Sequence, residues 1–282
     1  MTWRRGPLTD AALVQQQLWG SDPAGLARFA EPHTRPLFEA VLAATSVTAG
    51  TRLLDAGCGS GLLLELAAAR GATVTGLDVS PGLLAAARDR VPDAELWLGD
   101  LQELPFPNDF FGAVTGVNAF QFAGDPLAAL REAARVCQPG GIVAASTFAG
   151  PERAESTAVH EAMSALSPPQ RQAAHAPYSL SAPGGLEAGL AAAGLRVEAS
   201  GEVVCVWRYD SLADACRGLL SSAGGTRAAQ DAGRETVCAA IEKAVVPFTD
   251  PATGVISMRN VFRWVSAAKI SAAKISAVKP RP

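Results

Sequence analysis

The sequence has little charge, few cysteines and few histidines, and each shortage excludes a class of protein. Only 18% of the 282 residues are charged and the formal net charge is −3, so nothing favours a nucleic-acid partner. The three histidines and five widely spaced cysteines suit neither a zinc site nor a disulfide framework. We therefore expect no metal. The cysteines are Cys58, Cys137, Cys205, Cys216 and Cys238.

Long apolar runs are also absent. No stretch of about 18 apolar residues could span a membrane, and the N-terminus is too polar for a signal peptide. We expect a soluble, cytoplasmic protein without a membrane partner. The abundant alanine, arginine and glycine, with only four lysines, fit a GC-rich bacterial genome. A length of 282 residues allows one large domain or a core with a cap.

Strands and helices alternate from about residue 51. The apolar runs predict five strands separated by helices, which indicates a parallel sheet with helices on both faces. These strands are 52–55, 72–78, 94–98, 112–117 and 142–148.

The regular alternation of strands and helices ends at about residue 150. We expect helices over 154–166 and 186–193, and a helical stretch over 211–246 that breaks at Gly224-Gly225. Two further strands are expected over 195–207 and 255–265. Three of the four lysines lie in a five-residue near-repeat at the end, which predicts a solvated tail, with a functional basic tail as the alternative.

Three alternating glycines, Gly57, Gly59 and Gly61, lie directly between the first strand and its helix. Such a loop lets a ligand approach the backbone closely. The spacing G-x-G-x-G is one residue tighter than the dinucleotide fingerprint, and Asp55, two residues before Gly57, would repel a pyrophosphate. These features disfavour a dehydrogenase that binds NAD.

Carboxylates end three neighbouring strands: Asp55, Asp78 and Asp100. They suit a ligand that is a cationic nucleoside. Asp78 is placed to accept the hydroxyls of a ribose, Asp100 to accept an adenine amine, and Asp55 to face a cationic end.

These residues carry a family resemblance. The segment Leu53–Gly61 resembles motif I of the class I S-adenosylmethionine (SAM)-dependent methyltransferases, and Gly76–Ser80 resembles their second motif. Gly99–Phe106 and Phe110–Val114 resemble the third and fourth motifs. Arg135–Gly141 is similar to the turn before the fifth strand, although Cys137-Gln138 replaces the usual Leu-Lys. The similarity is closest to the type 11, ubiquinone/menaquinone-biosynthesis-like branch and is tight over about residues 50 to 150.

The resemblance implies a Rossmann-like, seven-stranded sheet in the order 3-2-1-4-5-7-6, with strand seven antiparallel, and SAM as cofactor without metal. It implies that the glycine loop contacts the methionine part of SAM and that Asp55 orients the ammonium, directly or through water. Cys58 is then a small packing residue, and Asn118 faces the reaction space. The implied cofactor-binding residues are Asp55, Gly57, Cys58, Gly59, Gly61, Asp78, Val79, Asp100, Leu101 and Asn118.

The chain is expected to divide into an N-terminal helical cap (1–48), a SAM-binding core (49–149), the remainder of the same domain (150–265) and a tail (266–282). Lid insertions are predicted at 150–180 and 211–246, with no core of their own. Together with the cap they would bind a small, fairly apolar acceptor; the oligomeric state stays open. Candidate pocket side chains are Trp19, Phe29, Phe120, Phe122, Met163, Tyr178 and Trp207.

No catalytic residue follows from the motifs. A general base helps when the acceptor is a hydroxyl or a protonated amine. His33 is the leading candidate because it lies in the predicted cap, although a structural histidine that contacts only cofactor or backbone is the favoured alternative. The other candidates are His160, His175, Tyr178 and Tyr209. A SAM-dependent methyltransferase acting on an O, N or C atom is the main hypothesis. A cyclase or rearrangement enzyme that binds SAM without methyl transfer, or a non-catalytic SAM-binding protein, are the alternatives.

Overall fold

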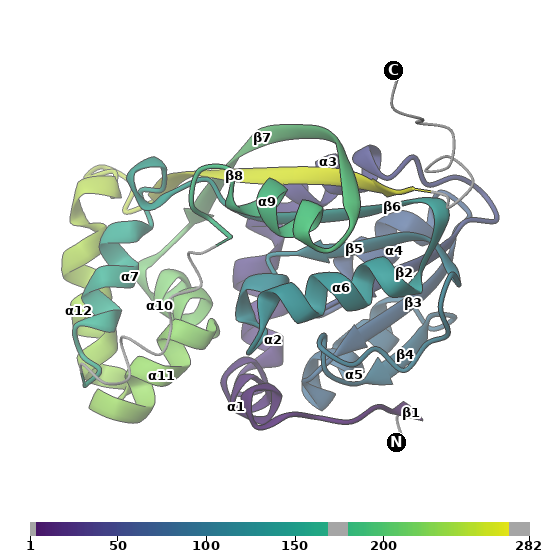
Figure 1. The fold of residues 1–282 in the computed structure, drawn as a ribbon. Helices are drawn as coiled ribbons and strands as arrows, with labels where there is room; N and C mark the ends of the chain where they lie inside the picture. The colour runs from purple at the N-terminus through teal and green to yellow at the C-terminus, as the bar shows by residue number, and fades with distance from the viewer. Residues whose placement is uncertain (1–3, 169–179, 271–282) are drawn as a thin grey trace.

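A central sheet of eight strands organises the chain in the computed structural model, which describes residues 4–168 and 180–270. The strand order is β1-β4-β3-β2-β5-β6-β8-β7 (Figure 1). Only β8 runs antiparallel to its neighbours among these strands. The strands are β1 Arg4–Arg5, β2 Arg52–Ala56, β3 Thr73–Asp78, β4 Glu95–Leu98, β5 Phe111–Val117, β6 Cys137–Phe148, β7 Leu195–Tyr209 and β8 Ile256–Lys269.

The order of β2 to β8 confirms the predicted 3-2-1-4-5-7-6 topology, including the antiparallel seventh strand. The predicted count of seven is one short. The extra strand, β1, comprises Arg4 and Arg5, which pair with Trp97 and Leu98 at the sheet edge. Two exposed arginines carry no apolar signal, so the sequence pattern could not indicate this strand.

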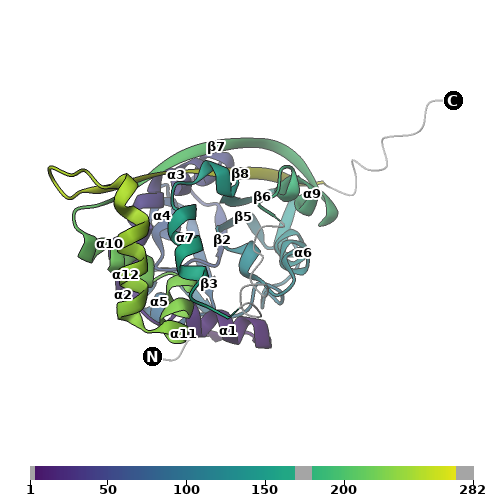
Figure 2. The same cartoon turned by 90° about the vertical axis from the view of Figure 1, so that its left-hand side faces the viewer.

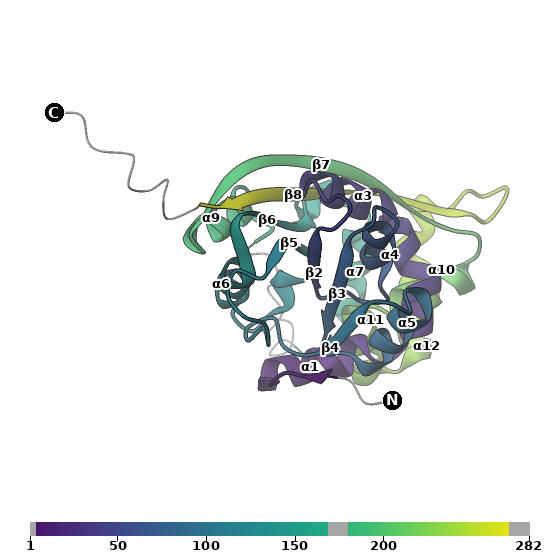
Figure 3. The same cartoon turned by 90° about the vertical axis from the view of Figure 1, so that its right-hand side faces the viewer.

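Helices cover both faces of the sheet, as the strand–helix alternation predicts (Figure 3). Leucines of α3, α4 and α5 pack on one face, and residues of α6 and α9 pack on the other. The sheet is therefore buried between two apolar layers. These helices are α3 Arg35–Ala44, α4 Leu62–Ala68, α5 Pro81–Arg90, α6 Pro126–Val136 and α9 Gly185–Ala192.

A group of helices lies beyond one end of the sheet (Figure 1), and these helices stand in front of the strands when the molecule is viewed from that side (Figure 2). Their buried side chains, such as Val159, Leu219 and Ile241, form a third apolar core separate from the two cores on the sheet. Residues of both predicted insertions build this core together with Tyr209, Ile256 and Met258 of β7 and β8. That neither insertion carries a core of its own stays a prediction. The helices are α7 Thr157–Ser164, α10 Leu212–Leu220, α11 Ala223–Ala232 and α12 Arg234–Val245.

The predicted break at Gly224-Gly225 is also wrong. Both glycines lie in the first turn of α11, where Ser222 Oγ accepts a hydrogen bond from the Gly225 N–H and caps the helix. The chain breaks instead at Ser221-Ser222 and at Gly233, whose φ of +84° ends α11. The helix predicted over 154–166 is shorter, since a 3-10 turn, η4 (Pro151–Arg153), precedes α7.

The N-terminal segment follows the edge of the sheet at which the parallel strands end. It contains α1 (Asp10–Trp19), α2 (Pro23–Gly25), a π-helical turn η1 (Leu26–Ala30) and a 3-10 turn η2 (Glu31–Thr34). The Gln16 side chain donates to the Val79 carbonyl oxygen over 2.6 Å, which ties α1 to the end of β3. This segment therefore borders the sheet edge where α/β proteins bind ligands.

The last strand continues beyond the predicted start of the tail. β8 includes residues up to Lys269, whose Nζ donates to Asp109 Oδ1 over 2.6 Å and to the carbonyl oxygens of Arg135 and Cys137. These bonds hold the first lysine of the near-repeat against the sheet. The rest of the repeat, with Lys274 and Lys279, falls outside the described residues.

Candidate cofactor and acceptor site

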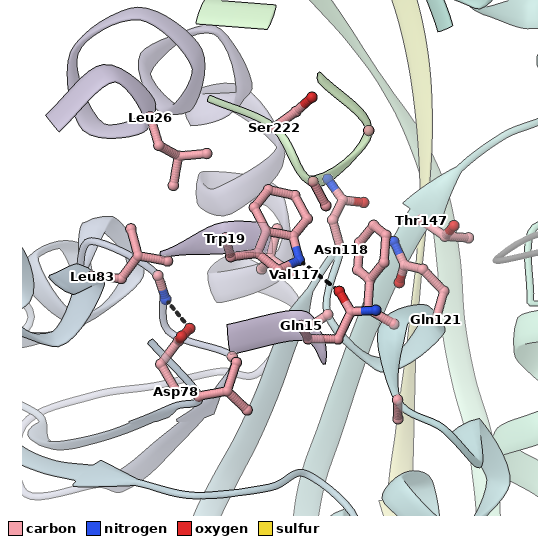
Figure 4. A pocket seen from close by; sticks show the side chains of 18 of the residues that line it. Gln15, Trp19, Leu26, Asp78, Leu83, Val117, Asn118, Gln121, Thr147 and Ser222 are labelled. Carbon is pink, nitrogen blue, oxygen red and sulfur yellow. Dashed lines mark hydrogen bonds between the residues drawn. The ribbon is translucent and has the colours of Figure 1, made fainter. Parts of the chain in front are cut away.

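A cavity of about 470 Å³ opens at the carboxyl edge of the sheet, between the core, the N-terminal segment and the lid helices (Figure 4). Most of the predicted cofactor-binding residues line it. They are Gly57, Cys58, Gly59, Asp78, Val79, Asp100, Leu101 and Asn118. The sheet topology thus brings residues from four strand ends into one wall.

The glycine loop is held tightly against β3. The N–H groups of Gly57 and Cys58 both donate to the Leu77 carbonyl oxygen, over 2.7 and 3.0 Å. Gly57 has a φ of +80°, and a Cβ at this position would lie 2.6 Å from the Ala119 Cβ. Only glycine satisfies both constraints, and the bare backbone leaves room for a ligand.

Asp78 connects the loop to the cavity. One carboxylate oxygen accepts the Gly59 N–H over 2.9 Å, and the other accepts the Ser80 N–H over 2.8 Å. Burial raises the pKa of Asp78, although these N–H donors oppose the shift. Each oxygen retains a lone pair, so this carboxylate can accept two neighbouring hydroxyls.

Asp100 lies farther along the same wall and anchors the N-terminal segment. Its Oδ2 accepts the Thr9 hydroxyl over 2.5 Å, and its Oδ1 accepts the Gln102 N–H over 3.0 Å. Asp100 thus couples the strand end to the start of α1, beside the cavity.

Two of the predicted residues do not line the cavity. Asp55 is buried beside Thr115, whose hydroxyl donates to its Oδ1 over 2.8 Å, and burial raises the pKa of Asp55 to about 7. Gly61 starts α4 with a φ of +87°, where a Cβ would lie 3.0 Å from the Ala87 Cβ. Gly61 therefore serves the packing of α4 on α5.

Cys58 lines the cavity as a small buried residue. Burial, with nearby carboxylates, raises the pKa of its thiol well above the usual value. The thiol is therefore not a nucleophile at neutral pH, in line with the packing role predicted from the sequence.

The leading base candidate, His33, lies outside the cavity lining. Its Nε2 donates to the Arg208 carbonyl oxygen over 2.7 Å, and its ring packs edge-on against Tyr209, with 4.7 Å between ring centroids. Burial lowers the pKa of His33 and raises that of Tyr209. This arrangement fits the structural alternative for His33.

His160, in contrast, lines the cavity from α7. Its ring lies edge-on to Phe148 and Trp207, with centroid separations of 5.9 and 6.0 Å. Burial lowers the pKa of His160 to about 4, so the imidazole is neutral at neutral pH. The remaining candidates His175 and Tyr178 fall outside the described residues.

Several predicted pocket side chains do face the cavity. Trp19, Phe122, Met163 and Trp207 line it, whereas Phe120 is buried against Gly116. Phe29 lies outside the lining, where the Arg28 and Arg217 side chains stack over its ring.

Sequence reasoning missed several polar residues of the site. Gln15 and Gln121 point into the cavity (Figure 4), and the Gln15 amide oxygen accepts the Trp19 indole N–H over 3.1 Å. Glu31 lines it from η2. No local motif signals Glu31, because only the irregular path of η1 and η2 places it there.

Charge is distributed unevenly along the cavity. The lining carboxylates, Glu31, Asp78 and Asp100, all belong to the N-terminal segment or the strand ends. The lid side contributes Arg227 and His160 and, within residues 4–168 and 180–270, no carboxylate. The same described residues contain no His/Cys/Asp/Glu group suited to a metal ion and no helix long and apolar enough to cross a membrane.

Comparisons with known proteins agree with this site. The methyltransferase domain family matches residues 54–145. The malonyl-[acyl-carrier protein] O-methyltransferase of Serratia marcescens is 38% identical over 115 residues, or 41% of this chain and 45% of the relative. The demethylmenaquinone methyltransferase of Tropheryma whipplei is 38% identical over 109 residues, or 38% of this chain and 46% of the relative. The chain thus spans less than half the length of either relative.

A solved structure, that of the 4+2 cyclase SpnF, superposes with a TM-score of 0.54 at 18% identity and covers 96% of this chain and 100% of its own. At this identity the likeness shows a shared fold alone. The family match includes the glycine loop, Asp78 and Asp100, which line one wall of the cavity. Over residues 54–145 the chain therefore matches a methyltransferase domain, and it is similar to relatives named as malonyl-[acyl-carrier protein] and demethylmenaquinone methyltransferases.

Proposed function

We propose that the cavity binds SAM and that the protein transfers its methyl group to a small organic acceptor. The observation that carries this proposal is one continuous cavity with a glycine-and-carboxylate wall at the strand ends and an aromatic wall under the lid. When bound, SAM supplies a methyl group already activated by its sulfonium.

We assign the cofactor side residue by residue. Asp78 would hold the ribose hydroxyls, with Val79, Asp100 and Leu101 around the adenine. Gly57 and Gly59 would lie against the methionine part, and Asn118 would face the reaction space. The bare glycine backbone and the two carboxylates suit a cationic nucleoside and would repel a phosphorylated one.

The residues that line the lid side of the cavity indicate the chemical class of the acceptor. Trp207, Phe148 and Met163 offer apolar surface, and the absence of a described carboxylate on that side disfavours a cationic amine. We therefore propose a neutral or anionic, partly aromatic acceptor, with no nucleic acid involved.

His160 replaces His33 as the proposed general base. Burial lowers the pKa of His160 to about 4, so the imidazole is unprotonated at neutral pH, and it would take the proton of an acceptor hydroxyl as the new bond to the methyl group makes that proton strongly acidic. The surrounding aromatic side chains exclude water and align the acceptor, which an in-line displacement requires.

We also propose a cytoplasmic location, since all five cysteines are free, as in reducing compartments.

The test is product analysis with SAM that carries an isotopic label in its methyl group. Incubation with a panel of aromatic hydroxy, carboxy and amino compounds should give labelled product from neutral or anionic members, with one S-adenosylhomocysteine released per product. Unlabelled cyclised product without S-adenosylhomocysteine would instead establish the cyclase alternative.

The same assay tests the base. His160→Gln should lower kcat by about 10²–10⁴-fold for a hydroxyl acceptor. His33→Gln is the matched control outside the cavity and should turn over like the wild type. Equal loss in both variants would reject the assignment of His160.

A further inference from the structure

Glu31 is a buried carboxylate that the motifs of the cofactor wall do not include. It lies on η2 at 8% exposure and lines the cavity. Its Oε2 accepts two hydrogen bonds, from the Ser60 hydroxyl over 2.6 Å and from Arg90 Nη1 over 2.5 Å. Two donors on one oxygen fix the orientation of the carboxylate.

The second oxygen of Glu31 remains available. Oε1 accepts no hydrogen bond from any residue in the described ranges, and it lies 3.9 Å from the position that a Cβ on Gly59 would occupy. It therefore faces the space directly above the glycine loop. A carboxylate oxygen that lines a buried wall and accepts no hydrogen bond from the protein favours a cationic partner.

Asp55, which the sequence resemblance suggests for this role, is less suited to it. Its side chain lies outside the cavity lining and is bonded to Thr115. Burial also raises its pKa to about 7, so the group is only partly ionised at neutral pH. Glu31, in contrast, lines the cavity, with its Oε1 3.9 Å from the position of a Cβ on Gly59.

We infer that Glu31 Oε1 binds the ammonium group of the amino-acid end of the cofactor. This inference rests on the proposed function, since it needs a SAM-type ligand over Gly57 and Gly59. Ser60 and Arg90 position the carboxylate through Oε2, and Glu31 thereby joins the N-terminal segment to the ligand.

The test compares two ligands by isothermal titration calorimetry. One is S-adenosylhomocysteine and the other is its deamino analogue, in which hydrogen replaces the amino group. Glu31→Gln should weaken S-adenosylhomocysteine by on the order of 10- to 100-fold, the range of a charge-assisted hydrogen bond. The deamino analogue should bind Glu31→Gln and wild type equally.

Glu65→Gln is the matched control. Glu65 also faces Arg90, at 3.8 Å, but it is half-exposed and lies outside the cofactor cavity. This variant should bind both ligands like the wild type. Thermal unfolding of each variant without ligand checks that it folds. If Glu31→Gln is unstable, Glu31→Asp takes its place. Glu31→Asp retains the charge and should keep part of the preference for the ligand with the amino group.

Two outcomes would overturn the inference. Equal weakening of both ligands in Glu31→Gln would mean that Glu31 acts only by tying the N-terminal segment to Ser60 and Arg90. Unchanged affinity for both would mean that Glu31 plays no part in binding. Failure of the wild-type protein to bind either ligand would instead refute the proposed function itself.

Discussion

At the residue scale, Asp55 carries a measurable electrostatic cost. Its carboxyl group is buried beside Thr115, and burial raises its pKa from the usual 3.8 to about 7. Between these values the folded protein holds a proton that the unfolded chain releases. The Asp55 contribution to the unfolding free energy must therefore fall as pH rises through this window.

We predict that Asp55→Asn removes this pH dependence. The unfolding free energy of the variant, relative to wild type, should rise between pH 4 and 7 with a slope approaching about 1.4 kcal/mol per pH unit. Urea unfolding at several pH values measures it. A difference between the two proteins that stays constant with pH would show that Asp55 is ionised when folded.

Some residues of the site could be predicted from the sequence and others could not. The motifs predicted which strand ends contribute to the site, and Asp78 and Asp100 do line the cavity. They could not indicate that Asp55 lies off the cavity or that Glu31 lies in it. The position of Glu31 depends on a π turn followed by a 3-10 turn, and no residue pattern in that segment encodes such a path.

At the element scale, the loop between β2 and α4 depends on glycine for two separable reasons. Gly57 has a φ of +80° and a close neighbour, Ala119. Gly140, in β6, has nearly the same φ, +81°, but nothing within 4 Å of the position of a Cβ. Substitutions at Gly57 and Gly140 therefore separate the cost of backbone strain from the cost of steric overlap.

We predict that Gly140→Ala costs about 1–2 kcal/mol of unfolding free energy, the cost of a left-handed conformation for alanine. Gly57→Ala should cost about 1–3 kcal/mol more, because the new methyl group overlaps Ala119. Chemical denaturation of both variants measures the difference. Equal losses would contradict the close approach of the loop to Ala119.

The start of α11 depends on a capping hydrogen bond more than on the composition of the segment. Two adjacent glycines suggested a break at Gly224-Gly225, yet the Ser222 cap lets α11 include both. Serine caps are visible in sequence, but several serines compete in this stretch. α11 also packs against α1 and α12, and the sequence pattern does not show these contacts.

At the scale of the whole molecule, the lid helices share one apolar core with Tyr209, Ile256 and Met258 from β7 and β8. The composition allowed a core with a cap, but it could not show that α7, α10, α11 and α12 would share one interior. That interior is built from contacts between segments about 80 residues apart in sequence, such as α7 and α12. Local periodicity contains no information about such pairs.

We predict that Ile241→Ala, at a fully buried position in this core, lowers the unfolding free energy by about 2–5 kcal/mol. The exposed neighbour Val246, 65% accessible, provides the control, and Val246→Ala should change stability by less than about 0.5 kcal/mol. Affinity for S-adenosylhomocysteine should not change in either. A loss of affinity in Ile241→Ala would mean that the lid core and the cofactor wall are coupled.

The proposed function depends on the binding of SAM by the wall formed from Gly57, Gly59, Asp78 and Asp100. Calorimetric titration of the wild-type protein with SAM and with S-adenosylhomocysteine tests it most directly, beside Asp78→Ala and the exposed control Asp93→Asn. Both ligands should bind the wild type and the control alike, and Asp78→Ala should weaken both by on the order of 10- to 100-fold. No binding of either ligand, or unchanged binding by a folded Asp78→Ala, would contradict it.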